Sequence, residues 1–163
     1  MMATRSGSLD PGLLLYLQQH QGVSVANLDA TLNDRSGLLG VSGVAGDLRA
    51  VLAAADGGDE RAWLAYAMFI HGLVRMVGAM VAVLGGVDAL IFTGGIGEHS
   101  ARVRRDVAAA FAYAGLRLDA AANEAPAGDV DVAPGDVAVR VLVVAAREDL
   151  AVLWEVKRVL GLK

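Results

Sequence analysis

The order of apolar and polar residues, together with typical capping residues, predicts a chain made mostly of helices. The expected helices cover residues 10–19, 24–32, 47–55, 60–84, 100–114 and 148–160. Asp10 followed by Pro11 is typical of a helix start, and Ser24 and Ser100 are good N-cap residues. The glycine-punctuated stretch 34–51 is expected to be a loop that leads into the third helix.

Two nearly continuous apolar runs predict strands, one within residues 85–95 and one over residues 137–144. Such runs are typical of strands covered on both faces. Residues 119–136, rich in Pro, Gly and Asp, are expected to form a surface loop. Strands alternating with helices predict an α/β fold with a mostly parallel sheet. Residues 1–60 contain no convincing strand, which is unusual for a complete α/β domain.

The stretch 62–84 is apolar and long enough to raise the question of a membrane span. His71 and Arg75 lie in its middle, where a charged residue is costly in a bilayer. Gly72 and Gly78 favour close packing against another helix. We therefore expect a buried core or interface helix rather than a membrane span.

Composition narrows the class of protein. The 163 residues fit one compact domain, because 55% are hydrophobic and there are 20 glycines but only 3 prolines. The net charge of −4 and the lack of a basic block make nucleic acid an unexpected partner. With no cysteine, disulfides and thiolate metal sites are excluded. No apolar leader is recognised at the start, so a cytoplasmic protein is expected.

The stretch ALIFTGGIGEHSARVRRDV, residues 89–107, carries the most informative chemistry. An apolar strand runs into clustered glycines and then into an amphipathic helix, an arrangement that can present backbone N–H groups to a phosphate or nucleotide. The spacing matches neither G-x-G-x-x-G nor G-x-x-x-x-G-K-[ST]. From the residues alone, a nucleotide site and a structural strand–helix turn both stay open.

Four stretches, in the same order, resemble the acetate kinase family. They are MATRSGSLDPGLLLYL (2–17), RSGLLGVSGVAGDLRAV (35–51), residues 78–107 and VLVVAAREDLAVLWEV (141–156). The resemblance implies one incomplete, helix-rich α/β domain over residues 1–163. Its fold would be the C-terminal ribonuclease-H-like domain of the acetate and sugar kinase/heat-shock-70/actin superfamily. Members have two related domains, so the resemblance also implies that the N-terminal domain is absent from this sequence.

The resemblance assigns two groups of residues to the nucleotide. They are Gly95, Ile96, Gly97, Glu98 and His99 after the strand, and Asp47, Leu48 and Arg49 at the third helix. The family usually has Asn in place of His99 and Phe in place of Leu48, and loss of that ring would weaken base packing. The alternatives are a structural turn for the first group and an ordinary N-cap followed by a solvated arginine for the second.

Two further residues are implied to act in phosphoryl transfer. By resemblance Arg5 is the catalytic arginine that stabilises charge on the transferred phosphoryl group. Glu148 corresponds to the family glutamate associated with Mg²⁺, whose preferred ligands are hard oxygen donors. The alternatives are an unstructured N-terminal arginine and a first-turn glutamate favoured by the helix dipole. Ala3 and residues 145–147 depart from the family's usual residues.

The resemblance implies an ATP-dependent kinase that phosphorylates acetate or another short-chain carboxylate to an acyl phosphate. ATP/ADP and Mg²⁺ are the expected cofactors, and the family implies a homodimer. A truncated, non-catalytic module that binds nucleotide or only dimerises is the alternative, because the acceptor loops would belong to the missing domain. His20, His71 and His99 have no spacing that suggests a metal cluster.

Overall fold

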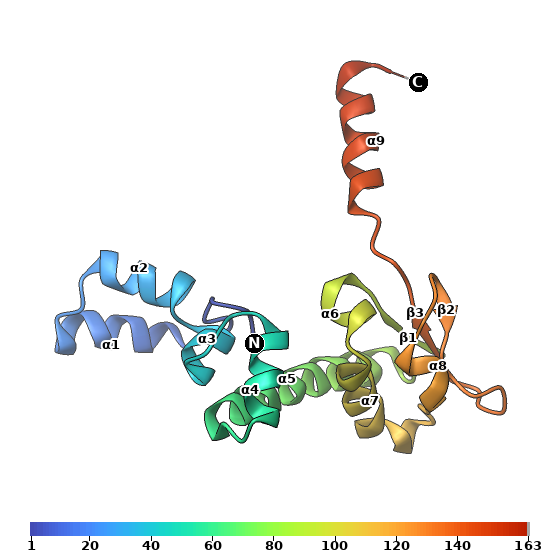
Figure 1. The fold of residues 1–163 in the computed structure, drawn as a ribbon. Coiled ribbons are helices and arrows are strands. Elements are labelled where there is room, and N and C mark those ends of the chain that lie inside the picture. Colours follow the sequence, from blue (N-terminus) through green and yellow to red (C-terminus); the bar gives the residue numbers. More distant parts are fainter. Residues whose placement is uncertain (163) are drawn as a thin grey trace. The chain divides into compact units, whose positions relative to one another are not determined.

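The structure, a computed structural model, describes residues 1–162. In chain order its elements are α1 (Pro11–Gln21), α2 (Val25–Asp34), α3 (Gly37–Ser42), α4 (Leu48–Asp56), α5 (Glu60–Leu84), β1 (Ala89–Phe92), α6 (Gly94–His99), α7 (Ala101–Ala110), a 3₁₀ turn η1 (Ala112–Ala114), α8 (Ala120–Glu124), β2 (Val130–Asp131), β3 (Arg140–Val143) and α9 (Glu148–Leu160) (Figure 1). The chain divides into two compact units, Met1–Gly78 and the part from Ala79 onward.

The predicted helix starts are confirmed by their caps. The Asp10 carboxylate accepts a hydrogen bond from the N–H of Gly12 at 2.6 Å, with proline at the first helical position. The Ser24 hydroxyl caps α2, and Asp47 and Ser100 cap α4 and α7 in the same way. Each cap satisfies a backbone donor that the first turn would leave unpaired.

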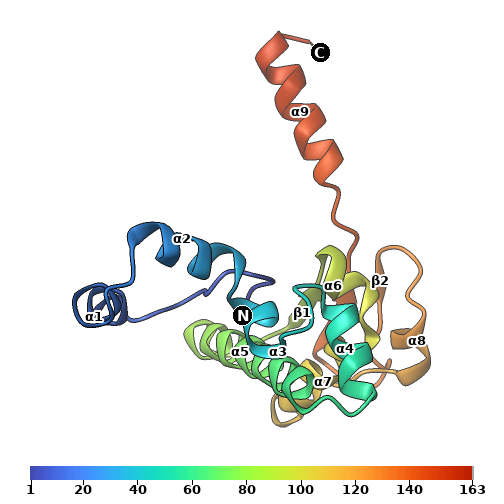
Figure 2. The same ribbon diagram turned by 60° about the vertical axis from the view of Figure 1, so that its left-hand side comes forward.

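The first unit has an all-helical core. Helices α3 and α4 lie beside the first part of α5 (Figure 2). The buried apolar side chains of this unit are Leu28, Leu38, Leu48, Val51, Ala62, Ala65, Tyr66 and Phe69. Only the first turns of α5 contribute to this core.

Helix α5 is long and apolar enough to cross a membrane. In its most apolar 18-residue stretch, only 6% is buried within the structure. Beyond Phe69 its apolar side chains become exposed, including Met76 at 67% and Val83 at 78%. The first part of α5 is therefore the expected core helix, whereas the second part is not buried within the described residues, and the alternative of an interface helix stays a prediction there. The second part of α5 therefore presents an exposed apolar surface.

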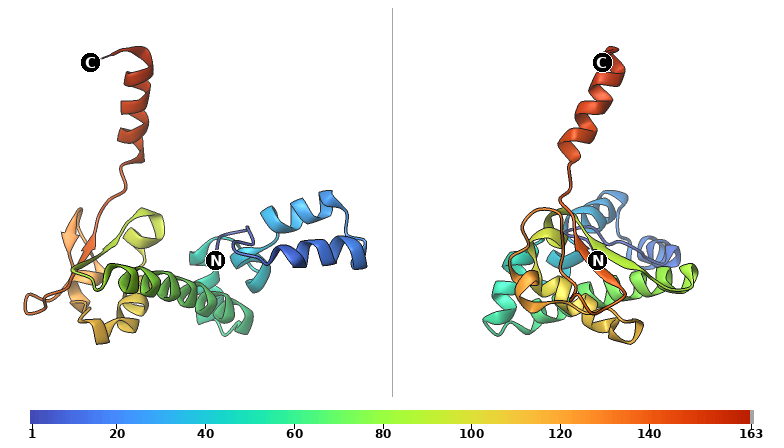
Figure 3. Two further views of the ribbon diagram at one scale, coloured as in Figure 1. Left: turned by 180° about the vertical axis from the view of Figure 1, so that it is seen from behind. Right: turned by 90° about the vertical axis from the view of Figure 1, so that its right-hand side faces the viewer.

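The second unit holds a three-stranded sheet in the order β1-β3-β2 (Figures 1 and 3). Strands β1 and β3 are parallel, with Phe92 opposite Val143, and β2 pairs antiparallel with β3. The apolar core on this sheet comprises Val132, Ala133, Val141 and Val143, against which Phe92, Leu118 and Ala122 pack. The predicted α/β character is therefore confirmed, but the sheet is mixed rather than mostly parallel, because β1 and β3 pair parallel while β2 and β3 pair antiparallel.

Three further expectations about this unit and its neighbour are wrong. Residues 119–136 are not a surface loop, because α8 and β2 lie within them and Val132 is fully buried. Strand β1 is not covered on both faces, since Ala89 and Ile91, which share one face, are exposed, Ile91 by 56%. In the first unit, the predicted loop 34–51 contains helix α3.

Candidate functional site

The carboxyl ends of β1 and β3 lie side by side at one edge of the sheet. The strands are parallel, and the N–H of Val144 extends their pairing by donating to the Phe92 carbonyl at 2.9 Å. The segments after both strands leave from this edge (Figure 1). In open α/β sheets, ligands bind beyond the carboxyl ends of parallel strands. The predicted residues Gly95–His99 and Glu148 follow these two strand ends.

The glycine cluster after β1 forms a short helix, α6, rather than the open turn expected from the sequence. Gly94 has φ +72°, a conformation that favours glycine and lets the chain leave the strand sharply. A Cβ on Gly95 would meet no atom within 4 Å, so its backbone faces open space. Ile96 is 39% exposed and offers an apolar surface beside it.

Gly97 has a different environment from Gly95. A Cβ at Gly97 would lie 3.2 Å from the carbonyl carbon of Phe92, the last residue of β1. The lack of a side chain at Gly97 therefore allows α6 to pack against the strand end. Gly97 serves the packing of the turn, whereas Gly95 leaves space that a ligand can enter.

The side chains of Glu98 and His99 both make hydrogen bonds within the unit. The Glu98 carboxylate accepts from the backbone N–H of Ala146 at 2.8 Å, which joins α6 to the loop after β3. His99 Nδ1–H donates to the Gly95 carbonyl at 3.0 Å, within α6. Both side chains stabilise the turn itself.

The loop after β3 is held by a second carboxylate. Asp129 accepts from the N–H of Ala145 at 2.9 Å and pairs with the Arg147 guanidinium at 2.9 Å. The Ala145 hydrogen bond, followed by that of Arg147, holds the pKa of Asp129 below its ordinary value. Glu148 follows this fixed loop, in the first turn of α9.

Glu148 is exposed, and its carboxylate has no hydrogen-bond or ion-pair partner within residues 1–162. No group of three or more His, Cys, Asp or Glu side chains that could hold a metal occurs in the described part of the chain. A single carboxylate fits Mg²⁺ that arrives with nucleotide phosphates and water, which is the usual way proteins bind this ion. It does not form a metal site without the nucleotide.

Arg104 is a functional candidate that the sequence analysis missed. It is 1% exposed, and it donates to the carbonyls of Gly97 and Glu98 at 2.8 Å each and to Asn123. Burial lowers the pKa of the guanidinium, while the charge of Glu124 acts in the opposite sense. A sequence signal existed, because Arg104 is spaced i, i+4 and i, i+7 from the apolar Ala108 and Phe111.

The N-terminal segment that carries Arg5 is ordered against α3. The N–H groups of Leu38 and Leu39 donate to the carbonyls of Met2 and Ala3 at 2.8 and 3.1 Å. Gly37 has φ +62°, and a Cβ there would lie 2.3 Å from the Met2 carbonyl oxygen. The backbone is therefore structured, in contrast to the alternative of an unstructured arginine. The Arg5 guanidinium is exposed and makes no hydrogen bond within the described residues.

Asp47 and Arg49 form an exposed ion pair at the start of α4. Arg49 Nη2 lies 2.6 Å from the Asp47 carboxylate, which also accepts from the Arg49 N–H. The hydrogen bond from the Arg49 side chain lowers the pKa of Asp47, and the same bond raises that of Arg49. Leu48, between them, is 5% exposed and packs in the core of the first unit.

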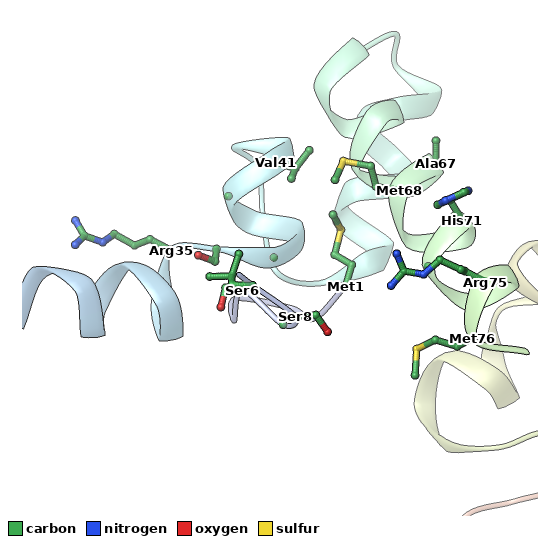
Figure 4. A pocket seen from close by; sticks show the side chains of 16 residues that line it. Met1, Ser6, Ser8, Arg35, Val41, Ala67, Met68, His71, Arg75 and Met76 are labelled. Atoms are coloured by element: carbon green, nitrogen blue, oxygen red, sulfur yellow. The ribbon is translucent and has the colours of Figure 1, made fainter. Parts of the chain in front are cut away.

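A cavity of about 820 Å³ lies within the first unit, beside the N-terminal segment. Ser6, Ser8, His71 and Arg75 are among its lining residues (Figure 4). None of the predicted site residues in the described chain lines it. The predicted site residues belong to both units. Arg5 and residues 47–49 lie in the first, and Gly95–His99 and Glu148 lie in the second.

Comparisons with known proteins identify relatives of the whole chain. The Acetokinase family model matches residues 1–154. The acetate kinase of Nostoc punctiforme is 48% identical over 159 residues, which cover 96% of this chain and 39% of that relative.

Solved structures agree. The acetate kinase of Porphyromonas gingivalis matches with TM-score 0.87 and 37% identity, over 98% of this chain and 40% of that one. A propionate kinase from Francisella tularensis matches with TM-score 0.81 and 34% identity, over 91% of this chain and 38% of that one.

The chain thus spans about 40% of the length of the relatives it matches. The predicted fold class is confirmed, namely a helix-rich, partial α/β domain of the acetate kinase type. The resemblance predicted from the four sequence stretches is confirmed as well. The chain belongs to the Acetokinase family.

Proposed function

We propose that this chain supplies the nucleotide-binding part of an ATP-dependent kinase that phosphorylates acetate or another short-chain carboxylate. In this reaction a carboxylate oxygen attacks the γ-phosphorus, the bond to the β-phosphate oxygen breaks, and acyl phosphate and ADP form. The family and the two kinase structures support this reaction class. Positioning and charge stabilisation supply most of the catalysis in phosphoryl transfer.

One observation carries the proposal for this chain. The turn Gly94–His99 and the loop before Glu148 follow two adjacent parallel strands, β1 and β3, and a hydrogen bond from Ala146 to Glu98 joins them. Gly95 and Ile96 then present an open backbone and an exposed apolar side chain at that edge. This arrangement fits an adenine nucleotide, whose base needs apolar contact and whose phosphates accept hydrogen bonds.

The roles differ among the predicted residues. Gly95 and Ile96 are proposed to contact the nucleotide, while Gly97, Glu98 and His99 shape the turn that carries them. In the first unit, Asp47 and Arg49 are exposed and polar, which supports a ligand role, and the burial of Leu48 supports a packing role. Arg5 is proposed as the arginine that stabilises the transferred phosphoryl group.

Glu148 is the residue proposed to hold Mg²⁺, through water or directly, once the nucleotide is present. When bound, Mg²⁺ neutralises charge on the phosphate oxygens. Glu148 is suited to this role because it is an exposed carboxylate at the end of a loop fixed by Glu98 and Asp129. We also propose a homodimer, as the resemblance implies, and a cytoplasmic protein without nucleic-acid or membrane partners, as composition and charge suggest.

The coverage of about 40% of the relatives' length favours a second candidate function. A non-catalytic module that binds nucleotide weakly, or only self-associates, would also fit the described residues. Activity of the purified chain separates the kinase from the module, and nucleotide binding separates both from a structural turn.

The test of the nucleotide site is an NMR titration of the ¹⁵N-labelled chain with ADP. We expect the amides of Gly95 and Ile96 to shift at millimolar ADP. Gly95→Val should abolish these shifts without unfolding the chain, since the added side chain enters open space. Gly135→Val is the matched control, because Gly135 also has open space and lies in a loop before β3. Unmoved Gly95 and Ile96 amides would show that the turn is structural only.

A further inference from the structure

Arg104 of α7 is a buried cation that makes four hydrogen bonds, two of them to the α6 turn. Its Nη1 donates to the carbonyls of Gly97 and Glu98, its Nε donates to the Asn123 side chain at 2.7 Å, and its Nη2 donates to the Asn123 carbonyl. Asn123 is itself fixed by donating to the Ala101 carbonyl at 3.0 Å. The guanidinium therefore connects α6, α7 and α8.

Burying a charged side chain in this position costs more free energy than burying an apolar one. A buried guanidinium loses its hydration, and its bonds here go to neutral oxygens rather than to a carboxylate. An apolar residue of similar length would avoid that cost. The gain from Arg104 is geometric. The carbonyls of Gly97 and Glu98 lie at the end of α6, where they lack intrahelical partners, and Arg104 supplies hydrogen bonds to both.

Glu98 extends this connection to the other strand end. Arg104 donates to the Glu98 carbonyl, and the Glu98 carboxylate accepts the hydrogen bond from the Ala146 N–H at 2.8 Å. Ala146 lies two residues before Glu148. The turn after β1 and the loop after β3 are thus linked through one residue whose backbone Arg104 fixes.

We propose that Arg104 and Glu98 are positioning residues, which set the turn Gly94–His99 and the loop before Glu148 in one fixed relation. This inference rests on the proposed nucleotide site and deepens it. Neither side chain contacts the nucleotide. Arg104 fixes the end of α6 by hydrogen bonds to its carbonyls. The Glu98 side chain fixes Ala146 relative to α6, so that Gly95 and Glu148 can contact the same ligand.

The test uses variants that separate hydrogen bonding from charge and packing. Glu98→Gln keeps an oxygen that can accept from the Ala146 N–H, whereas Glu98→Ala removes it. Arg104→Lys keeps donors for the carbonyls, whereas Arg104→Met keeps only the bulk. The readouts are amide hydrogen exchange at Ala146 without ligand and the dissociation constant for ADP with Mg²⁺ from NMR titration.

We expect faster Ala146 exchange and about tenfold weaker ADP binding in Glu98→Ala, with near wild-type values in Glu98→Gln. Arg104→Met should shift the Gly95 and Ile96 amides and weaken ADP binding, with partial rescue in Arg104→Lys. Glu98 is only half-buried and its hydrogen bond to Ala146 is exposed to solvent, so its variants provide the test even where Arg104→Met fails to fold.

Two failures are distinguishable. If the wild-type chain binds ADP and Glu98→Ala binds it equally well, the positioning inference is overturned and the proposed nucleotide site stands. If the wild-type chain binds no ADP, the proposed site is overturned and the inference falls with it.

Discussion

A Cβ atom on Gly97 would lie 3.2 Å from the carbonyl carbon of Phe92, whereas a Cβ on Gly95 would meet no atom within 4 Å. These glycines belong to one short helix and to one family motif, yet they have different physical roles. At Gly97 the backbone of α6 lies against the end of β1. At Gly95 the backbone faces open space, where a ligand can approach.

The first prediction is that valine destabilises the chain at Gly97 but not at Gly95. Gly97→Val should lower the free energy of unfolding by about 1–3 kcal/mol, because it presses on the strand backbone. Gly95→Val should change it by no more than about 0.5 kcal/mol. Urea unfolding followed by circular dichroism measures both. Equal stabilities would mean that α6 does not need Gly97 to pack against β1.

The helices show how far local sequence signals reach. The limits of α5 and α9 match the predicted ones, and the caps at Asp10, Ser24 and Asp47 are present, because each signal involves residues close in the chain. Helix α3 was not predicted, since it begins at Gly37, where the chain is shaped by the distant residue Met2.

The site shows where local signals end. The glycine cluster was found from its composition, but the assignment of Gly97 to packing depends on its position against Phe92. Arg104 was not singled out from the sequence, although its spacing from Ala108 and Phe111 places it on the buried face of α7. The link from Glu98 to Ala146 spans 48 residues, and no local pattern predicts it.

The second prediction concerns catalysis. The purified chain should show no acetate-dependent ATP turnover above background, because it spans about 40% of its relatives' length and phosphoryl transfer depends on complete positioning. A hydroxamate assay for acyl phosphate measures this, with the Porphyromonas gingivalis enzyme as the positive control. Turnover by this chain that disappears in Arg5→Ala would contradict the prediction and identify an active kinase.

The third prediction is self-association at tens of micromolar. The second part of α5 exposes Met80 at 56% and Val83 at 78%, and α9 exposes Trp154 at 67%. Exposed apolar side chains gathered on helices drive association of like chains. Sedimentation velocity should detect dimers or larger species, reduced in Val83→Lys and unchanged in Ala109→Lys, which adds the same charge to an exposed site on α7. A monodisperse wild-type monomer would refute it.

The fourth prediction is a loss of stability in acid that depends on Asp131. Its carboxylate accepts from Arg140 Nε at 2.6 Å and from the Ala133 N–H at 2.9 Å. Burial raises the pKa of Asp131, but the hydrogen bonds from Ala133 and Arg140 outweigh it, so the pKa lies below its ordinary value.

Because the folded pKa of Asp131 is lower than the unfolded value of about 3.9, the unfolded state takes up the proton first as pH falls. The stabilisation is complete above about pH 5 and declines as pH falls through the folded pKa. Urea midpoints between pH 6 and pH 3 should fall less steeply in Asp131→Asn than in wild type. Parallel curves would show that the pair adds nothing to the acid response.

The last prediction compares nucleotides. AMP, ADP and ATP should bind within about tenfold of one another, in the high micromolar to millimolar range, which corresponds to roughly 4–6 kcal/mol. The reason is the surroundings of the turn: Ile96 offers apolar contact to the base, whereas the Arg104 guanidinium is buried and hydrogen-bonds to backbone carbonyls and Asn123. Added phosphates therefore gain little binding energy from this unit.

NMR titrations of the same labelled chain with the three nucleotides measure the series. An ATP affinity a hundredfold above that of AMP would require a phosphate-binding cation elsewhere in the chain, and Arg49→Ala and Arg5→Ala would then identify it.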